Sequence, residues 1–278
     1  MTKPVFVEIF IIGNEILNGE ILDTNTQWLC HEIHRLGGQV VRSTVLRDDL
    51  GTIAGELGAA LGRRPEVILT SGGLGPTADD LTLAAVAEGV GFPLELHEQA
   101  REMIRKSYDD FHARGILEFG GLNPAREKMA YLPKGAIPLT NPAGTAPGVL
   151  LQAGETTIIS LPGVPPELKG IFTTSMQPFL QKTFQGGLSA LHTLTVCCND
   201  ESLLEPVLRR VVPAHPAVYI KSLAGEPGEM PELDILLAAT GTDQAAVQAL
   251  IEAALKDLRE GLAGLGFSHR DKAAGNLK

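Results

Sequence analysis

The chain has 278 residues, enough for two domains of ordinary size, and its 44% hydrophobic and 20% charged residues exclude a disordered polypeptide. The formal net charge of −10 argues against general affinity for nucleic acids or anionic membranes. It leaves room for a small phosphorylated ligand held by backbone amides and a metal ion. The three cysteines show no metal-ligand spacing and no disulfide framework, so we expect a cytoplasmic protein. We find no targeting segment and no run of the roughly 18–20 apolar residues that a membrane span needs.

The first part of the chain alternates between strand and helix patterns. Apolar runs predict buried strands over residues 5–12, 40–46 and 67–70. Helical spacing of apolar residues predicts helices over residues 24–36 and 50–61. This alternation predicts a parallel sheet with right-handed crossovers, and therefore an α/β domain.

The loop after the third strand carries the clearest functional signal. It holds three glycines, Gly72, Gly73 and Gly75, so backbone N–H groups can approach a ligand closely. Thr77 is expected to cap the next helix, with Asp80 as its capping-box partner. A strand, a glycine loop and a helix N-terminus together predict an anion site. The spacing matches neither the P-loop nor the dinucleotide-binding fingerprint.

Acidic residues lie where the anion would bind. Asp79 and Asp80 would repel a phosphate unless a cation stands between them, which indicates a divalent metal. The alternative is that both acids only stabilise the helix dipole, and the local sequence leaves this open. Asp48 follows the second strand and either caps a helix or joins Asp79 around one cation. Glu15 follows the first strand and either reaches a metal or ribose hydroxyl or is a solvated loop carboxylate.

The middle of the chain is less regular. Residues 94–114 have helical character, and a short strand is expected at 136–139. A loop rich in small residues follows at 140–148, where Asn141 and Thr145 are candidate ligand contacts and a plain turn is the alternative. Residues 149–152 and 156–160 predict a hairpin.

The last third of the chain predicts a separate α+β domain. Strand patterns occur at residues 192–198, 218–222 and 233–238, and helical patterns at 201–211 and 243–261. The Gly225-Glu226-Pro227-Gly228 turn matches the G-x-x-G of KH domains, but its acidic surroundings predict a KH-like shape without nucleic-acid binding. We expect three segments: a first domain over 1–172, the KH-like domain over 173–265 and a flexible tail over 266–278.

Four loops together resemble one known family. They are Gly13-Asn-Glu-Ile-Leu17, Gly72-Gly-Leu-Gly-Pro-Thr-Ala-Asp-Asp80, Asn141-Pro-Ala-Gly-Thr-Ala-Pro-Gly148 and Leu161-Pro-Gly-Val-Pro-Pro-Glu167. In this order they closely resemble the amino-terminal domain of the CinA (competence/damage-inducible) family, part of the MoaB/MogA-like molybdopterin-binding superfamily. The resemblance covers residues 1–172 and implies a three-layer α/β/α fold with a mostly parallel sheet.

The resemblance extends more loosely to the following unit. That unit resembles the family's KH-like middle domain, although Cys197-Cys-Asn-Asp-Glu-Ser202 departs from the glycine-containing turn expected there. Full-length members carry a further carboxy-terminal domain that deamidates nicotinamide mononucleotide. The 278 residues stop before such a domain could begin, so we do not expect that activity.

For the first domain the resemblance implies a metal-dependent pyrophosphatase that splits ADP-ribose into AMP and ribose 5-phosphate. The two functional carboxylates of the superfamily fall on Asp48 and Asp79. The expected catalytic residues are Asp48, Asp79, Asp80 and Glu15, of which the first three are also expected metal ligands. The expected substrate-binding residues are Gly13, Asn14, Ser71, Gly72, Gly73, Gly75, Thr77, Asn141, Gly144 and Thr145.

The expected cofactor is a divalent metal (Mg, Mn or Co), with or without a monovalent cation, and no haem, flavin or zinc. The expected partners are a nucleotide substrate and a second copy of the chain in a homodimer, with neither nucleic acid nor membrane. Two alternatives stay open: a non-catalytic module that binds a pterin or nucleotide, and an enzyme of molybdenum-cofactor biosynthesis. The pair Asp79-Asp80 favours hydrolysis over binding alone. The Gly13–Leu17 and Asn141–Gly148 loops favour the CinA type over the molybdenum enzymes.

Overall fold

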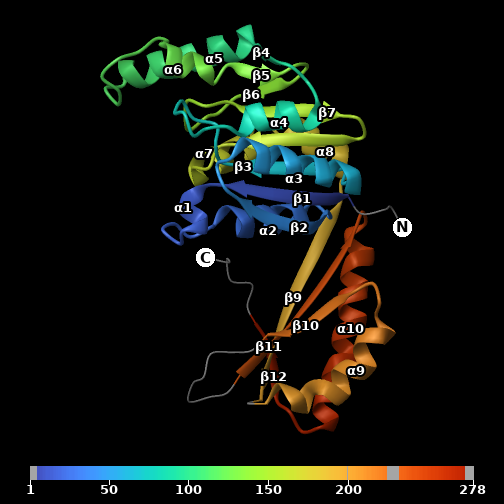
Figure 1. Cartoon of the computed structure of the whole chain (residues 1–278). Coiled ribbons are helices and arrows are strands. Elements are labelled where there is room, and N and C mark those ends of the chain that lie inside the picture. Colours follow the sequence, from blue (N-terminus) through green and yellow to red (C-terminus); the bar gives the residue numbers. More distant parts are fainter. Residues whose placement is uncertain (1–4, 199, 224–231, 273–278) are drawn as a thin grey trace. The chain divides into compact units, whose positions relative to one another are not determined.

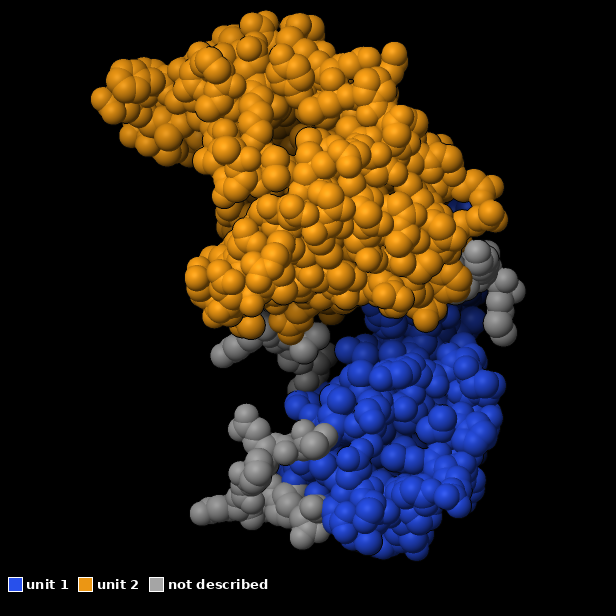
Figure 2. All heavy atoms as spheres, viewed as in Figure 1, with its two compact units in different colours: residues 1–3, 34–37, 185–278 blue, residues 4–33, 38–184 orange. Residues whose placement is uncertain are grey.

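The computed structural model describes residues 5–198, 200–223 and 232–272, which form two compact units (Figures 1 and 2). The larger unit comprises residues 5–33 and 38–184 of the described chain. The smaller unit comprises residues 34–37 and the described residues from 185 onward.

A six-stranded sheet is the centre of the larger unit. Its strands are β1 (Phe6–Ile12), β2 (Gln39–Leu46), β3 (Val67–Ser71), β6 (Ile137–Leu139), β7 (Gly148–Ala153) and β8 (Thr156–Leu161), and they lie in the order β2-β1-β3-β8-β7-β6. Strands β2, β1, β3 and β8 pair in parallel, whereas β7 is antiparallel to both β8 and β6, so β7 alone runs in the opposite direction. The predicted hairpin is confirmed as β7 and β8.

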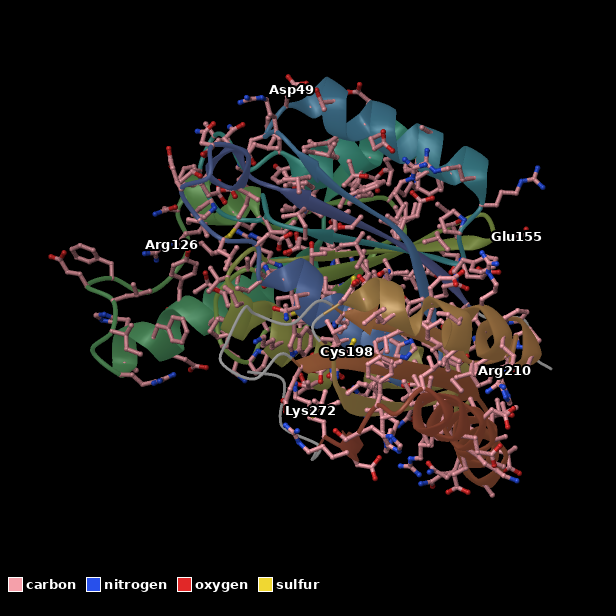
Figure 3. All side chains as sticks on the ribbon, turned by 90° about the horizontal axis from the view of Figure 1, so that it is seen from below. Asp49, Arg126, Glu155, Cys198, Arg210 and Lys272 are labelled. Carbon is pink, nitrogen blue, oxygen red and sulfur yellow. The ribbon has the colours of Figure 1, made fainter. Side chains whose placement is uncertain are left out.

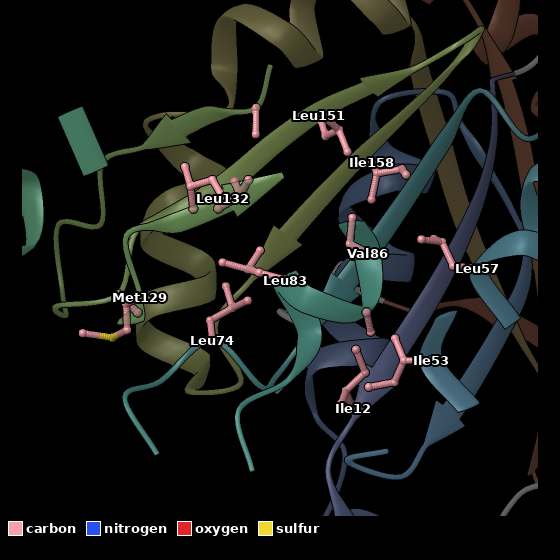
Figure 4. Packing of buried hydrophobic residues seen from close by; sticks show 14 of the residues in the cluster. Ile12, Ile53, Leu57, Leu74, Leu83, Val86, Met129, Leu132, Leu151 and Ile158 are labelled. Atoms are coloured by element: carbon pink, nitrogen blue, oxygen red, sulfur yellow. The ribbon is translucent and has the colours of Figure 1, made fainter. Parts of the chain in front are cut away.

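Helices cover both faces of this sheet. They are α1 (Asn14–Leu17), α2 (Asn25–Arg35), α3 (Leu50–Arg63), α4 (Thr82–Val90), α7 (Pro165–Thr173) and α8 (Gln177–Phe184). Alternate side chains of a strand point to opposite faces, so Phe10 and Ile12 pack with α3 and α4, while Ile9 and Ile11 face the other layer. Figure 4 shows Ile12 beside Ile53 of α3, and Leu83 and Val86 of α4, within this core. The three-layer α/β/α fold with a mostly parallel sheet is confirmed.

A small extension of the larger unit lies between α4 and β6. It contains β4 (Leu94–Leu96), α5 (Glu98–Ala113), α6 (Pro124–Lys128) and β5 (Tyr131–Pro133), with β4 antiparallel to β5. The prediction of one helical segment over 94–114 is therefore wrong at its start. The His97 side chain accepts a hydrogen bond from the Ala100 amide and begins α5 there. Helix α6 was not predicted, although Asn123 and Pro124 are typical of a helix start.

The smaller unit is an antiparallel four-stranded sheet with two helices packed on it. Its elements are β9 (Leu188–Cys197), the 3₁₀ turn η1 (Glu201–Leu204), α9 (Glu205–Ala214), β10 (Tyr219–Leu223), β11 (Glu232–Gly241), α10 (Gln244–Gly264) and β12 (His269–Asp271), with the strands in the order β10-β11-β9-β12. The division between the units follows α8, later than the expected boundary after residue 172. The predicted flexible tail contains β12, which pairs with β9, and its Arg270 also binds Glu232 of β11.

The G-x-x-G turn at residues 225–228 lies outside the described residues, so the KH-like shape stays a prediction. Within the described part of the chain, no helix has both the length and the apolar composition required to cross a bilayer.

Candidate functional site

A cleft with a volume of about 540 Å³ opens in the larger unit where β1, β3 and β8 end. The carboxyl ends of parallel strands are where open α/β sheets bind ligands. Ten of the residues predicted from the sequence line it: Gly13, Glu15, Asp48, Ser71, Gly72, Gly73, Gly75, Asp79, Asp80 and Thr145. Four others lie in the same loops but do not line it: Asn14, Thr77, Asn141 and Gly144. The structure thus gathers four segments that are distant in the sequence around one space.

The glycine loop, residues 72–75, has one buried side chain and three backbone amides without a hydrogen-bond acceptor in the described chain. Leu74 is 5% exposed and its side chain packs in the core beside Leu83 (Figure 4). The Gly72 amide already donates to the Leu161 carbonyl oxygen at 3.0 Å, so it is not available to a ligand as the sequence suggested. Within the described chain, the amides of Gly73, Leu74 and Gly75 donate to no protein acceptor. These three amides are the candidate phosphate ligands.

The helix after this loop starts later than predicted. Thr77 is not a helix cap, because α4 begins at Thr82 and residues 77–80 form a separate turn. Thr82 holds the helix start against the loop, since its Oγ1 donates to the Gly72 carbonyl oxygen at 2.8 Å and its amide to that of Gly73. The connection between β3 and α4 is therefore longer than a direct strand-to-helix turn, and more of its backbone lies outside regular structure.

The turn at residues 77–80 orients the two predicted acids. The Thr77 hydroxyl lies 2.5 Å from Asp79 Oδ1 and 2.6 Å from Asp80 Oδ2, and the Thr77 amide donates to Asp80 at 2.9 Å. The hydrogen bond from the Thr77 hydroxyl lowers the pKa of Asp79 below its ordinary value, and the field of Lys128 adds to this. Asp79 is therefore an anion at neutral pH. Thr77 positions these carboxylates and does not line the cleft, and its role as a ligand contact stays a prediction.

Lys128 is a component of the site that the sequence analysis missed. It is the last residue of α6, and its ammonium group donates to the carbonyl oxygens of Thr77 and, at 2.8 Å, of Asp80. It lies 48 residues from Asp80 along the chain, so no local pattern connects the two. Lys128 fixes the backbone of the acidic turn and partly offsets its charge.

Replacing Lys128 by methionine keeps the aliphatic stem and removes the bonds to both carbonyl oxygens. We expect the acidic turn to loosen, and the metal concentration that half-saturates the cleft to rise about tenfold, because the two charge-assisted hydrogen bonds that position the carboxylates are lost. Titration with Mn²⁺ measures this. The matched control is Lys134→Met, because Lys134 is 65% exposed, contacts Glu95 at 3.5 Å and lies outside the cleft. An unchanged metal affinity in Lys128→Met would contradict this role.

Asp48 and Asp49 have separate roles. Asp49 caps α3, since its Oδ1 accepts from the Thr52 amide at 2.8 Å (Figure 3). Asp48 is therefore not the helix cap that the sequence left open. Its Oδ2 accepts from the Asn14 amide at 2.8 Å and holds the start of α1, while its other oxygen has no partner in the described chain. Asn14 thus supports Asp48 from outside the cleft.

Glu15 lies in the short helix α1, which the sequence analysis took for a loop. Its carboxylate makes no hydrogen bond or ion pair with any described residue, and it lines the cleft. A Cβ on Gly13 would approach Glu15 Oε1 to 2.5 Å, so a glycine at 13 gives this carboxylate its space. Glu15 is free to bind a cation or to accept a proton.

The side chain of Asn141 holds the loop at residues 140–148 together through hydrogen bonds. Its Nδ2 donates to the Ala146 carbonyl oxygen and to Glu167 Oε2, and its Oδ1 accepts from the amides of Ala143 and Gly144. All its hydrogen-bonding atoms therefore have partners in the loop or in Glu167 of α7, and Asn141 does not line the cleft, so its role as a ligand contact stays a prediction. Gly144 is needed for space, because a Cβ there would lie 2.0 Å from Glu167 Oε2.

Glu167 lines the cleft and was not among the predicted site residues, although it lies in a quoted motif. Its burial raises the pKa of this carboxyl above the ordinary value, and the hydrogen bond from Asn141 opposes that effect. A carboxyl with a raised pKa in a cleft is typical of acid-base groups in catalytic sites.

The raised pKa of Glu167 predicts a pH effect on stability. Between the unfolded and the folded pKa the folded state binds more protons, so the unfolding free energy falls as the pH rises through the folded pKa. In Glu167→Gln this fall should be absent and the Asn141 contact retained. The difference in thermal midpoint between variant and parent should therefore grow in favour of the variant from about pH 4 to about pH 8. A constant difference over that interval would show that Glu167 does not titrate this way.

The carboxylates of the cleft fit a metal ion that a bound ligand would also coordinate. Among the described residues, no three carboxylate, histidine or cysteine side chains come together as a ready-made metal site. Asp48, Asp79 and Glu15 nevertheless line one cleft with free carboxylate oxygens. Mg²⁺ is commonly held by one or two carboxylates together with substrate phosphates and water, rather than by an all-protein cage. The chain supplies the carboxylates of such an arrangement.

A sequence model of the family described as "Probable molybdopterin binding domain" matches residues 8–182, which include every residue of the cleft. The chain belongs to this molybdopterin-binding domain family. Its relatives include a protein from Aeropyrum pernix that is 39% identical over 263 residues, covering 94% of each chain. A protein from Thermococcus kodakarensis is 38% identical over 214 residues, covering 75% of this chain and 81% of the relative.

Among solved structures, the larger unit is similar to a crystal structure of the protein CinA from Thermoplasma acidophilum, described as having unknown function. The two are 36% identical with a TM-score of 0.57, and the match covers 63% of this chain and 98% of that chain. The family match and this similarity support the fold resemblance drawn from the four loops.

Proposed function

We propose that the larger unit is a metal-dependent hydrolase of nucleoside diphosphate linkages that splits ADP-ribose into AMP and ribose 5-phosphate. The observation that carries this proposal is the pairing, in one cleft, of free backbone amides with anionic carboxylates. The amides of residues 73–75 suit a phosphate, and Asp48, Asp79 and Asp80 suit the cation that a diphosphate requires beside them.

Different residues would bind the metal, bind the diphosphate and accept the proton. Asp79, with Asp48 and Asp80, would hold a divalent cation, which supplies charge neutralisation at the phosphoryl oxygens and an acidified water. The amides of residues 73–75 bind the diphosphate. Glu15 accepts a proton from the attacking water as the phosphorus–oxygen bridge breaks, and Lys128 keeps the acidic turn in place.

Incubation with ADP-ribose, NAD and FAD in the presence of Mg²⁺, Mn²⁺ or Co²⁺ tests this function. We expect AMP and ribose 5-phosphate from ADP-ribose with at least one metal, and no products in the presence of a chelator. Failure of all three metals to yield AMP would contradict the proposal.

The second candidate is a non-catalytic module that binds a pterin or a nucleotide, including a role in molybdenum-cofactor biosynthesis. It is favoured by the family description and by the lack of a ready-made metal site among the described residues. Binding of ADP-ribose or a pterin without turnover in the same assay would establish it. In both cases we propose a cytoplasmic homodimer whose smaller, KH-like unit does not bind nucleic acid.

A further inference from the structure

Asn25 places an unpaired acceptor beside the cleft. It is the first residue of α2, is 6% exposed and lines the cleft. Its Nδ2 donates to Ser71 Oγ at 3.0 Å and to the Gly163 carbonyl oxygen at 2.8 Å. Its Oδ1 is buried and has no hydrogen-bond partner in the described chain. A buried acceptor left without a donor costs free energy, so this atom calls for an explanation.

The orientation of this amide is fixed by its neighbours. The Gly163 carbonyl oxygen can only accept, so a flipped amide would set two acceptors against each other. Ser71 Oγ already donates its proton towards the Pro162 carbonyl oxygen, at 3.3 Å. Asn25 Oδ1 therefore remains the unpaired atom and can be satisfied only by a donor. A phosphate at neutral pH has almost no proton to donate, so the partner is an N–H or O–H group.

The residues around Asn25 indicate what carries that donor. Ile21, Leu22 and Val164 line the same cleft and are 56%, 82% and 52% exposed, so they leave apolar surface that a ligand could cover. Val164 adjoins Gly163, the residue bonded to Asn25, and Leu22 lies three residues before Asn25 in the chain. The carboxylate of Asp23 is engaged by the amide and hydroxyl of Thr26. Exposed apolar side chains are thus available beside Asn25 for a ligand to cover.

We propose that Asn25 is the specificity-determining residue of a subsite for a planar nitrogen heterocycle, whose amino group donates to Asn25 Oδ1 while the ring lies against Ile21, Leu22 and Val164. Adenine and pterin share this chemistry. The inference rests on the proposed function and deepens it by naming the heterocycle that the cleft recognises.

Binding of matched ligand pairs tests the subsite. AMP is compared with IMP, which carries an oxygen in place of the amino group, and pterin is compared with 2-dimethylaminopterin, which lacks the amino N–H. With Mg²⁺ present, calorimetry should show that the parent prefers the amino form of at least one pair by about tenfold or more. Asn25→Ala should reduce this preference to about threefold or less. The pair that responds identifies the ring.

Thr26→Ala is the matched control. It removes the hydroxyl bond to Asp23 and loosens the same helix start without touching Asn25, so the ligand preference should persist. The proposal is overturned if Asn25→Ala keeps the parent's preference, if Thr26→Ala loses it equally, or if the parent shows no preference in either pair. A parent that selects AMP through Asn25 but never hydrolyses ADP-ribose would contradict the proposed function and leave this subsite standing.

Discussion

Asp79→Asn is expected to lower kcat/KM for ADP-ribose by at least about 100-fold while the protein folds normally. The asparagine retains an oxygen that can accept from the Thr77 hydroxyl, so the turn at residues 77–80 keeps its hydrogen bonds. What is lost is the negative charge, which the lowered pKa of Asp79 maintains at neutral pH. Steady-state kinetics at saturating metal, with the thermal midpoint as a folding check, measures this effect.

Asp49→Asn provides the matched control. It makes the same chemical change beside Asp48, at a residue that caps α3 and does not line the cleft. Asparagine caps helices as well as aspartate does, so turnover should stay close to that of the parent. Equal activity of Asp79→Asn and the parent would remove Asp79 from the reaction. Equal losses in both variants would mean that the cleft responds only to overall charge.

Gly72→Ala should destabilise the larger unit by about 3 kcal/mol or more, with loss of ligand binding. The residue has a φ of +111°, and a Cβ would lie 2.0 Å from the carbonyl oxygen of Ile12. Residue 72 cannot move away easily, because its amide donates to the Leu161 carbonyl oxygen and its own carbonyl oxygen accepts from the Thr82 hydroxyl. Urea unfolding monitored at Trp28, which packs against Phe172 in this unit, measures the loss.

The control for Gly72→Ala is Gly58→Ala within α3. A Cβ at Gly58 meets no atom within 4 Å, so this change should stabilise the unit by about 0.5–1 kcal/mol through helix propensity and the unfolded chain. If Gly72→Ala were as stable as the parent, residue 72 would not lie as close to the Ile12 carbonyl oxygen of β1 as the structure shows.

The strands and the gathering of the loops were predictable from local pattern. Continuous apolar runs such as Val67–Leu69 predict strands buried on both faces, and parallel strands carry their following loops to one edge of the sheet. The same reasoning predicts that Glu15, Asp48 and Asp79 lie close together, and all three line the cleft.

The features of the site that the sequence does not predict depend on contacts between residues far apart in the chain. Nothing near Lys128 indicates that its ammonium group reaches the Thr77–Asp80 turn, and the role of Asn141 follows from its contact with Glu167. The start of α4 was misplaced because Thr77 and Asp80 make the hydrogen bond of a capping box within a turn that does not continue as helix. Local sequence cannot distinguish these two outcomes, because the contact is the same in both.

The most direct test of the metal-diphosphate cleft is the anomalous scattering of Mn²⁺ in crystals grown with a non-hydrolysable methylene analogue of ADP-ribose. We predict a manganese peak in coordination distance of Asp79 and of the analogue's phosphate oxygens, with the phosphates against the amides of residues 73–75. A peak elsewhere on the protein, or an analogue bound in this cleft with no metal beside Asp79, would contradict the account.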